Sequence, residues 1–280
     1  MGLGAGRHCG EIAMDAMIRE VVQATYQALA PVAAREDSEA LRMGLTLGFV
    51  SRTTGGYSGK RVLDLGSSLG VHLVAAKRLG AVSAIGLDRF IFPDAFDNDF
   101  ILQRGELEAL QRAWQTEGVE IHRHDLADAL PFPDESFDLV VCNAVIEHLH
   151  GIHKQLFAEV RRVLAPGGSF VFTTPNLASL LKRVRFVFGR SPMWDLRDYF
   201  GSGREFTGHV REFTVTECTQ MLAWSGLVPT TVTSRPSYFR WSWLKNPSKF
   251  HNVFFQLASR LWPTWGDLVF AAGKKLSSVK

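Results

Sequence analysis

The chain has little of what marks secreted, membrane-spanning or zinc-binding proteins. Its 280 residues include three cysteines, Cys9, Cys142 and Cys218, which lie far apart and form no CxxC pair. This distribution favours a reducing compartment and argues against a zinc site. No apolar stretch of about 18 residues or more is present, so we expect no transmembrane helix. The N-terminus lacks the pattern of a signal peptide, and we therefore expect a cytoplasmic protein.

An excess of one charge and internal repeats are also missing. The net charge is only +3 at pH 7, which by itself does not indicate a nucleic-acid-binding protein. No repeat or low-complexity tract is visible. Hydrophobic residues make up 46% and charged residues 21% of the chain, which is ordinary for a globular protein with a sizeable core. Composition therefore predicts a globular domain but does not indicate its function, which must be inferred from local motifs.

The first part of the chain is predicted to be helical. Apolar residues recur at helical spacing over residues 11–34, and a second helix is expected over 38–52. A glycine-rich cluster at 55–59 then ends the helical part. We interpret residues 1–57 as an N-terminal helical extension and residues 58–280 as one domain.

Short apolar runs then alternate with helical patterns. Helices are predicted over 70–79, 106–117 and 152–164, between strands over 60–65, 84–87, 119–124, 137–142 and 169–174, the last opened by a Pro-Gly-Gly turn at 166–168. Thr214 and Glu217 form a capping-box pattern that opens a helix ending at Gly226, and strands follow at 227–233 and 268–272. This alternation predicts a Rossmann-like, doubly wound α/β sheet of about seven mostly parallel strands. N-terminal helices and a helical lid, inserted at 177–213 and 235–262, complete the predicted fold.

The strongest local motif lies between the first strand and the following helix. It runs Val62-Leu63-Asp64-Leu65-Gly66-Ser67-Ser68-Leu69-Gly70. Small residues let a backbone approach a ligand closely, and a helix N-terminus offers N–H groups that have no helical partner. The alternative is an ordinary strand–turn–helix connection. A dinucleotide fingerprint, G-x-G-x-x-G, fails twice because position 68 is Ser and position 71 is Val.

Carboxylates follow the next two predicted strands. Asp88 ends the second strand, 18 residues after Gly70, where a carboxylate can accept hydrogen bonds from both ribose hydroxyls. Asp125 follows the third strand and can accept from an adenine amino group, while Leu126 can pack on the ring. The alternative for each acid is a solvated residue at a strand end or turn. Together with the loop, the two acids predict a nucleoside-containing ligand.

In combination these residues resemble the motifs of class I S-adenosylmethionine methyltransferases of the type 11 family. The likeness covers residues 58–176 and, more loosely, 205–275. It includes the glycine-rich loop, with Ser68 in place of the middle glycine, and the stretches 144–149 and 162–168. The resemblance implies S-adenosylmethionine as cofactor and a binding set made of Asp64, Gly66, Ser67, Ser68, Gly70, Asp88, Arg89, Asp125, Leu126 and Asn143.

Two further stretches narrow the resemblance. Residues 173–176 (Thr-Thr-Pro-Asn) and 208–214 (Gly-His-Val-Arg-Glu-Phe-Thr) are similar to small-molecule O-methyltransferases, including the ubiquinone-pathway type and those of polysaccharide clusters. The sequence lacks an Asn-Pro-Pro-Tyr-like run of the kind found in nucleic-acid and protein methyltransferases of this fold. The resemblance therefore implies methyl transfer to a hydroxyl of a small molecule, glycan or lipid-linked acceptor, with no nucleic-acid partner.

Three alternatives stay open. Carbon and nitrogen acceptors share this fold, so an N- or C-methyltransferase acting on a small metabolite is one of them. A non-catalytic S-adenosylmethionine-binding protein is the second. The third, a nicotinamide-dependent oxidoreductase, is disfavoured by the failed fingerprint.

Histidines are the candidates for a catalytic base, since histidine titrates near neutral pH and a hydroxyl acceptor must lose a proton. By place and by resemblance, His209 is the first candidate for a catalytic or substrate-positioning residue and His148 is the second. A hydrogen-bonded surface or capping histidine is the alternative for each. Arg211 can pair with an anionic acceptor group, or with Glu205 or Glu212. No carboxylate cluster at metal-ligand spacing is visible, so we expect no metal site and metal-independent transfer.

Basic and aromatic residues concentrate in the predicted lid. Residues 177–260 contain twelve Lys and Arg against five Asp and Glu, and with the edge to Trp265 they hold six of the seven tryptophans. Basic residues beside aromatics suit an anionic membrane interface. The same aromatics can stack on sugar rings or build the lid's own core. We expect the lid to shape the acceptor site, with peripheral contact to the inner membrane surface as an open alternative.

Overall fold

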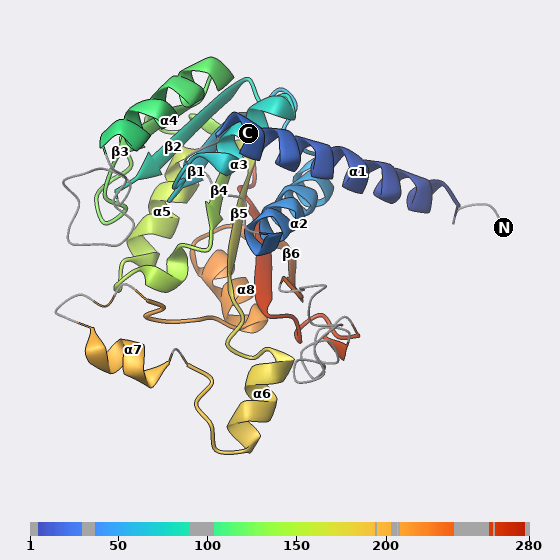
Figure 1. Cartoon of the computed structure of the whole chain (residues 1–280), viewed down its shortest axis with the longest axis vertical. Coiled ribbons are helices and arrows are strands. Elements are labelled where there is room, and N and C mark those ends of the chain that lie inside the picture. The colour runs from blue at the N-terminus through green and yellow to red at the C-terminus, as the bar shows by residue number, and fades with distance from the viewer. Residues whose placement is uncertain are drawn as a thin grey trace. The chain divides into compact units, whose positions relative to one another are not determined.

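The structure is a computed structural model (Figure 1) that describes residues 5–29, 37–89, 104–193, 195–202, 206, 208–237, 258–259 and 261–277. The chain divides into two compact units, Met1–Asp125 and Leu126–Lys280. Each unit has its own strands, helices and buried core.

Unit 1 consists of two long helices followed by three strands that alternate with helices. Two parallel pairs, β1 with β2 and β2 with β3, join these strands. Helix α1 packs against α2 and α3, and α3 packs on β1, β2 and α4. The elements are α1 (Ala5–Ala28), α2 (Asp37–Thr54), β1 (Arg61–Leu65), α3 (Val71–Arg78), β2 (Ser83–Asp88), α4 (Arg104–Glu117) and β3 (Glu120–Arg123).

Buried apolar side chains explain why unit 1 alternates strand and helix. Leu63 and Leu65 of β1 are fully buried, as expected for a parallel strand covered on both faces. Residues 73–76 of α3 are also fully buried, so one short helix covers the strands with small and branched side chains. The register pairs Leu63 with Ile85 and Leu65 with Leu87, which brings the carboxyl ends of β1 and β2 to the same edge. The candidate ligand loop leaves β1 at that edge.

Unit 2 contains four strands and the helices that follow them. Strand β5 pairs in parallel with β4 and antiparallel with β7, and β7 pairs antiparallel with β6. Helix α5 packs on β5, and α8 packs on β6 and β7. The elements are β4 (Phe137–Asn143), the short 3-10 helix η1 (Ile146–His148), α5 (His153–Val163), β5 (Leu164–Pro175), α6 (Leu180–Val187), α7 (Leu196–Gly201), α8 (Val215–Trp224), β6 (Val228–Arg235) and β7 (Leu268–Lys274).

The seven strands make up one sheet with the order β3-β2-β1-β4-β5-β7-β6. Strand β7 runs antiparallel to both of its neighbours, while the other pairs described above are parallel. The sequence prediction of a Rossmann-like α/β sheet with about seven mostly parallel strands is therefore confirmed. In the described part of the chain, no helix combines the length and the apolar character needed to span a bilayer.

The capping box predicted at the start of α8 is present. Glu217 N donates to Thr214 Oγ1 at 3.2 Å, and Thr214 N donates to Glu217 Oε2 at 2.8 Å. Two backbone N–H groups that lack helical partners are thereby satisfied. The cap fixes the point at which the segment before α8 enters the helix.

Two predicted boundaries differ from the structure. The periodicity predicts a first helix over 11–34, whereas α1 begins at Ala5 and ends at Ala28, and residues 30–36 lie outside the described residues. The Pro-Gly-Gly sequence at 166–168, predicted as a turn, lies inside β5, which begins at Leu164. The pairing of β5 with β4 shifts register between Phe137 and Leu139, and an irregularity of this kind lets a strand continue through a turn-like sequence.

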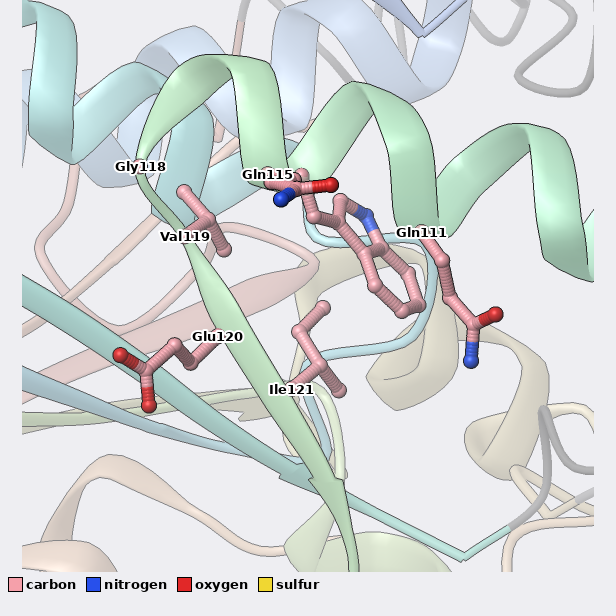
Figure 2. Close-up of a pocket in the computed structure, with 7 residues that line it drawn as sticks. Gln111, Gln115, Gly118, Val119, Glu120 and Ile121 are labelled. Atoms are coloured by element: carbon pink, nitrogen blue, oxygen red, sulfur yellow. The ribbon is translucent and has the colours of Figure 1, made fainter.

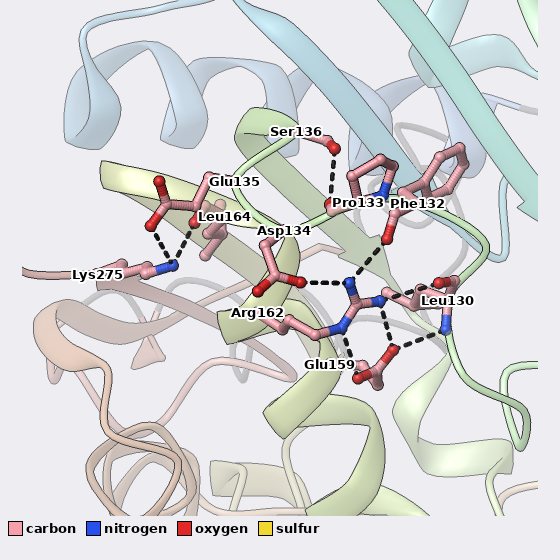
Figure 3. A network of polar contacts seen from close by, with 10 residues as sticks. All are labelled: Leu130, Phe132, Pro133, Asp134, Glu135, Ser136, Glu159, Arg162, Leu164 and Lys275. Carbon is pink, nitrogen blue, oxygen red and sulfur yellow. Dashed lines mark hydrogen bonds and ion pairs between the residues drawn. The ribbon is translucent and has the colours of Figure 1, made fainter.

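Arg162 ties the loop before β4 to helix α5 (Figure 3). Its guanidinium donates to the carbonyl oxygens of Leu130 and Phe132 at 2.9 and 2.7 Å, and to the Asp134 carboxylate at 2.9 Å. Two further bonds, of 2.8 and 2.7 Å, reach the carboxylate of Glu159. The hydrogen bonds with Glu159 raise the pKa of Arg162 and lower the pKa of Glu159. One side chain of the 162–168 motif therefore holds the entry into β4.

Candidate functional site

The loop between β1 and α3 adopts left-handed backbone conformations at three positions. Gly66, Ser68 and Gly70 have φ values of 72°, 47° and 80°. Gly66 N and Ser67 N both donate to the carbonyl oxygen of Leu87, at 2.8 and 3.2 Å, which ties the loop to the end of β2. Gly70 is the residue before the first turn of α3, so the loop leads directly into a helix N-terminus.

Ser68 occupies the position where the resemblance predicts a glycine. A left-handed conformation costs a non-glycine residue about 1 kcal/mol or more, so serine is an unfavourable choice on conformational grounds. Its backbone N–H donates to Asp88 Oδ2 at 2.8 Å, a charge-assisted bond that offsets part of this cost. The hydrogen bond also brings together two residues that the sequence assigned separately to the cofactor.

Close packing requires glycine at two positions beside the loop. A Cβ atom on Gly70 would lie 2.8 Å from Ile121 Cδ1 and 2.9 Å from Trp114 Nε1. On Gly86 of β2, a Cβ atom would collide with the Ser67 side chain. Neither position has room for a side chain, so glycine at both positions allows the close packing at this edge of the sheet.

Two side chains of the loop region carry buried polar atoms that lack partners. Asp64 is 2% exposed and Ser67 is 6% exposed. In the described part of the chain, Asp64 Oδ1 and Ser67 Oγ have no hydrogen-bond partner. Unsatisfied buried polar atoms are costly and are common where a ligand supplies the partner. These residues therefore fit a polar ligand at the loop.

Asp64 belongs to a short buried chain of polar groups that the sequence did not reveal. Its Oδ2 lies 3.4 Å from His72 Nδ1, and His72 Nε2 lies 2.9 Å from the Tyr57 hydroxyl. All three side chains are buried. Burial, and secondarily the charge of Asp64, raise the pKa of Tyr57 well above its ordinary value.

The next two predicted cofactor residues contact each other. Arg89, which follows β2, forms an ion pair with Asp125, which follows β3. An adenine amino group bound by Asp125 would share that carboxylate with Arg89. Leu126, the first residue of unit 2, is buried.

A pocket of about 340 Å³ lies between the end of α4 and β3 (Figure 2). The Trp114 side chain connects it to the loop, because Trp114 Nε1 donates to the carbonyl oxygen of Leu69 at 3.0 Å. The sequence assigned no role to this region, whose lining residues are Gln111, Trp114, Gln115, Gly118, Val119, Glu120 and Ile121.

In unit 2, Asn143 ends β4 and is fixed by its neighbour strand. The Thr173 hydroxyl donates to Asn143 Oδ1 at 2.5 Å. Ala144, the next residue, has a φ of 57°, and its N–H donates to both the carbonyl and the hydroxyl oxygen of Thr173. The chain therefore leaves β4 through a strained residue, as it leaves β1 through the loop.

The two predicted catalytic histidines lie side by side. The His148 and His209 rings are 5.0 Å apart in an edge-to-face arrangement. His148 Nδ1 lies 3.1 Å from the carbonyl oxygen of Gly208, and Val210 N donates to the carbonyl oxygen of Glu147 at 2.8 Å. These backbone contacts hold the 208–211 segment against η1. The structure thus brings together residues about 60 positions apart in the sequence.

His209 is linked to a buried carboxylate. His209 Nδ1 lies 2.9 Å from Glu212 Oε1, and the other oxygen of Glu212 forms an ion pair with Lys182 of α6. Glu212 is only 5% exposed. Burial lowers the pKa of Lys182 to about 8, although the charge of Asp267 acts in the opposite direction. Arg211 pairs with Glu217 at 2.8 Å, and not with Glu212.

Glu147, His148 and His209 also form a group that can hold a metal ion. Their ligand atoms lie within 4.8 Å of one another, and Glu147 is buried. The sequence expectation of metal-independent transfer was based on local spacing alone. Among the described residues, these three are the candidate ligands for a metal ion.

Sequence reasoning missed Tyr57, His72, Lys182 and the linking role of Glu212. Glu212 follows His209 by three residues, a spacing that allows the two side chains to meet. His72 is the second residue of α3, on the far side of the loop from Asp64. The predicted lid aromatics Trp241 and Trp243 lie outside the described residues.

Comparisons with known proteins show what part of this chain is similar to. A family model described as a methyltransferase domain matches residues 63–172. The ubiquinone biosynthesis O-methyltransferase of Klebsiella pneumoniae (strain 342) is 31% identical over 132 residues, which cover 47% of this chain and 49% of that relative. A probable S-adenosylmethionine-dependent methyltransferase of Mycolicibacterium smegmatis is 38% identical over 108 residues, 39% of this chain and 35% of that relative. The chain thus spans about half the length, or less, of the curated relatives it matches.

Solved structures share the fold over most of the chain. An S-adenosylmethionine-dependent methyltransferase from Mesorhizobium loti aligns with a TM-score of 0.50 at 22% identity, covering 78% of this chain and 92% of the other. The PH0226 protein from Pyrococcus horikoshii aligns with a TM-score of 0.53 at 18% identity, covering 88% and 93%. At these identities the likeness establishes the fold alone.

Proposed function

We propose, from the S-adenosylmethionine-dependent methyltransferase domain that this chain carries over residues 63–172, that it methylates a hydroxyl of a small-molecule, glycan or lipid-linked acceptor. S-adenosylmethionine is the cofactor of this family, and the loop 66–70 with Asp64 and Asp88 is our assignment for its binding. We assign residues 1–57 to an N-terminal extension and 58–280 to the methyltransferase domain, with 177–213 and 235–262 as its lid.

The contact between His209 and Glu212 is the observation that carries the choice of a hydroxyl acceptor. In our proposal Glu212 is ionised, so its oxygen accepts a hydrogen bond from His209 Nδ1, which lies 2.9 Å away and carries the proton. A carbonyl oxygen likewise only accepts, so His148 Nδ1 carries a proton toward Gly208. In the neutral form of both rings, Nε2 is then the basic nitrogen. Two histidines with the same tautomer favour proton removal, which a hydroxyl acceptor needs.

Proton transfer then follows from the placement of these groups. The bound cofactor supplies a methyl carbon activated by a positively charged sulfur. With this cofactor bound, the acceptor oxygen would take the methyl group, the sulfur would leave as a neutral thioether, and the hydroxyl proton would pass to a base of the protein. In our proposal His209 Nε2 takes this proton, and the buried Glu212 carboxylate stabilises the imidazolium that forms. The ion pair with Lys182 fixes the position of the Glu212 carboxylate.

A labelling experiment tests this function for any acceptor present in a cell extract. The purified protein is supplied with methyl-deuterated S-adenosylmethionine and a metabolite extract, and mass spectrometry searches for a labelled product. His209→Ala should lower turnover by about 100-fold or more while leaving the affinity for S-adenosylhomocysteine within about twofold. His122→Ala is the matched control, since His122 is 53% exposed and pairs only loosely with Glu120 at 3.5 Å.

The other outcomes separate the alternatives. Near-normal turnover by His209→Ala would move the role to His148 or remove the need for a base. A label on carbon or nitrogen would replace the hydroxyl acceptor with another class. Cofactor binding without any labelled product, across extracts and membrane fractions, would favour a non-catalytic protein.

Exposed apolar side chains on α6 and α7 support our proposal that the lid meets a lipid-linked or glycan acceptor. Phe186, Val187 and Phe188 are 69%, 80% and 77% exposed, and Phe200 of α7 is 87% exposed. Arginines accompany them at positions 183, 185, 190 and 197. Aromatic side chains beside cations suit an anionic lipid surface.

Co-sedimentation with anionic liposomes tests the membrane part of this proposal. The double variant Phe186→Ser/Phe188→Ser should lose most of the binding shown by the wild type. Trp224→Ser is the control, because Trp224 is 79% exposed but lies on α8. A wild type that ignores anionic liposomes would exclude membrane contact. A double variant with full turnover on the true acceptor would make the lid a purely structural element.

A further inference from the structure

Three metal-ligating side chains of unit 2, those of Glu147, His148 and His209, form a group that we call the Glu-His-His cluster. One ligand atom from each residue lies within 4.8 Å of the other two. Glu147 and His148 are neighbours in η1, whereas His209 belongs to a segment about 60 positions later. Val210 N and Arg211 N fix that segment, because they donate to the carbonyl oxygen of Glu147 at 2.8 and 3.2 Å. Backbone hydrogen bonds therefore hold the two parts of the cluster together.

The spacing of the cluster fits a transition-metal ion. Bonds of about 2.0–2.2 Å at tetrahedral angles place the ligand atoms of zinc about 3.4 Å apart. Starting from separations of at most 4.8 Å, these atoms would approach one another by no more than about 1.4 Å, which rotation of the side chains can supply. The rings of His148 and His209 already lie 5.0 Å apart.

The hydrogen bonds of the two rings match the usual surroundings of metal-ligating histidines. A histidine that binds a metal through one nitrogen almost always donates from the other to a carboxylate or a backbone carbonyl. His209 Nδ1 lies 2.9 Å from the Glu212 carboxylate, and His148 Nδ1 lies 3.1 Å from the carbonyl oxygen of Gly208. With the protons on Nδ1, as proposed above, Nε2 of each neutral ring carries the lone pair that a metal needs.

The third ligand supplies a negative charge at depth. Glu147 is 1% exposed, and a buried carboxylate is costly unless a cation or hydrogen-bond donors compensate its charge. A divalent ion provides such compensation. Two imidazoles with one carboxylate favour zinc and neighbouring transition metals, because magnesium and calcium prefer ligand sets made of oxygen. Three protein ligands also leave a fourth position for water, as in open zinc sites.

We propose that Glu147, His148 and His209 bind a divalent transition-metal ion such as zinc, and that the bound ion inhibits methyl transfer. The inhibition rests on the proposed function, in which His209 Nε2 takes the proton of the acceptor. A nitrogen whose lone pair is bound to a metal cannot take a proton at the same time. The ion and the acceptor therefore compete for one atom, and the protein without the ion is the active form. Binding of the ion is independent of which acceptor is methylated.

Zinc binding to the full chain is measured by competition with a chromophoric chelator, and cobalt(II) serves as a spectroscopic probe of the same site. The wild type should bind zinc and give the visible absorption of four-coordinate cobalt. Glu147→Gln, His148→Ala and His209→Ala should each weaken zinc binding by about 100-fold or more and abolish that absorption. Glu212→Gln, which alters only the partner of His209 Nδ1, should weaken zinc binding about 10-fold.

An exposed histidine beside a carboxylate provides the control. His122 lies 3.5 Å from Glu120, and the two side chains are 53% and 70% exposed. His122→Ala should leave zinc affinity within about 2-fold of the wild type, because two exposed ligands hold zinc far more weakly than three. Circular dichroism shows whether each variant is folded. If Glu147→Gln does not fold, the variants of His148 and His209 decide, since both histidines are only half-buried.

The labelling assay described above tests the inhibition. Zinc at about ten times its dissociation constant should lower turnover about 10-fold, and EDTA should restore it. A wild type that does not bind zinc, or zinc binding that survives in all three ligand variants, would overturn the inference. Zinc that raises turnover would overturn the inhibitory role. An extract that gives no labelled product with or without zinc would count against the proposed function, and the binding measurements would then decide the metal site.

Discussion

Replacing Arg162 by methionine should destabilise the protein by about 3 kcal/mol. Methionine keeps a long, unbranched apolar stem but removes the guanidinium, and with it five hydrogen bonds of 2.7–2.9 Å (Figure 3). Those bonds are what attach the loop before β4 to α5. The change tests whether the 162–168 motif has a structural function.

The magnitude follows from the partners. The Asp134 side chain is 74% exposed, so its bond contributes almost nothing. The bonds to the carbonyl oxygens of Leu130 and Phe132 contribute about 1 kcal/mol each, because Arg162 is 29% exposed and water can replace part of them. The pair with Glu159, which is 18% exposed, adds about 1 kcal/mol. At about 2–4 °C per kcal/mol, the melting temperature should fall by roughly 6–12 °C.

Urea unfolding followed by circular dichroism measures the loss. Arg161→Met is the matched control, because Arg161 is the preceding residue of α5 and is exposed, and its unfolding free energy should stay within about 0.5 kcal/mol of the wild type. An Arg162→Met protein as stable as this control would refute the reasoning, since it would show that water replaces the whole network.

The dependence of stability on acidic pH provides a second test of the Arg162 network. The hydrogen bonds from Arg162 lower the pKa of Glu159 in the folded state, so Glu159 stabilises the fold above its unfolded pKa. This contribution is lost as the pH falls through the folded pKa. The wild type should therefore lose stability more steeply than Arg162→Met on acidification below about pH 4.5. Parallel pH profiles would contradict the assignment.

Three further predictions concern the site. Asp88→Ala should weaken S-adenosylhomocysteine binding by roughly 2 kcal/mol, about 30-fold, in calorimetry, because it removes a buried carboxylate that also accepts from Ser68 N; unchanged affinity in a folded variant would exclude it from the site. Ser68→Gly should leave stability unchanged or raise it by up to about 1 kcal/mol, since it relieves a φ of 47° while making the unfolded chain more flexible; a clear loss would mean that the serine side chain stabilises the loop. Methyl transfer should survive treatment with EDTA, and activity lost with EDTA and restored by a divalent ion would assign Glu147, His148 and His209 as metal ligands.

The residues that we propose for the cofactor could be chosen from the sequence because their signals are local. The loop 66–70 and Asp88 each follow directly from a strand that the apolar pattern makes visible, and parallel pairing brings the ends of β1 and β2 to one edge. Ser68 stands where the resemblance predicts a glycine. It nevertheless adopts the left-handed backbone conformation that glycine favours. Sequence could not show that its amide binds Asp88, because that contact spans 20 positions.

The residues that we propose for the acceptor could be chosen from the sequence only in part. Sequence pointed to His209 and His148 by resemblance, and the structure places their rings 5.0 Å apart. It could not point to Lys182, whose ion pair with Glu212 links α6 to a segment 30 residues away. Contacts between side chains that are distant in the sequence produce no periodic pattern. A lysine among other basic residues of a helix is expected to be exposed to solvent.

The proposed cofactor and acceptor sites each contain a buried carboxylate, which ordinary apolar packing does not require. Asp64 in unit 1 and Glu212 in unit 2 are 2% and 5% exposed, and each has an oxygen directed at a histidine Nδ1. A buried carboxylate that fixes a histidine tautomer serves chemistry better than it serves stability, because an apolar replacement would stabilise the fold at least as well. In our proposal the Glu212 carboxylate, 2.9 Å from His209 Nδ1, holds that ring for a proton, whereas His72 Nδ1, 3.4 Å from Asp64 Oδ2, has no hydrogen-bond partner in the described part of the chain. Glu212→Gln should therefore lower turnover, because the amide that replaces the carboxylate cannot stabilise an imidazolium by charge.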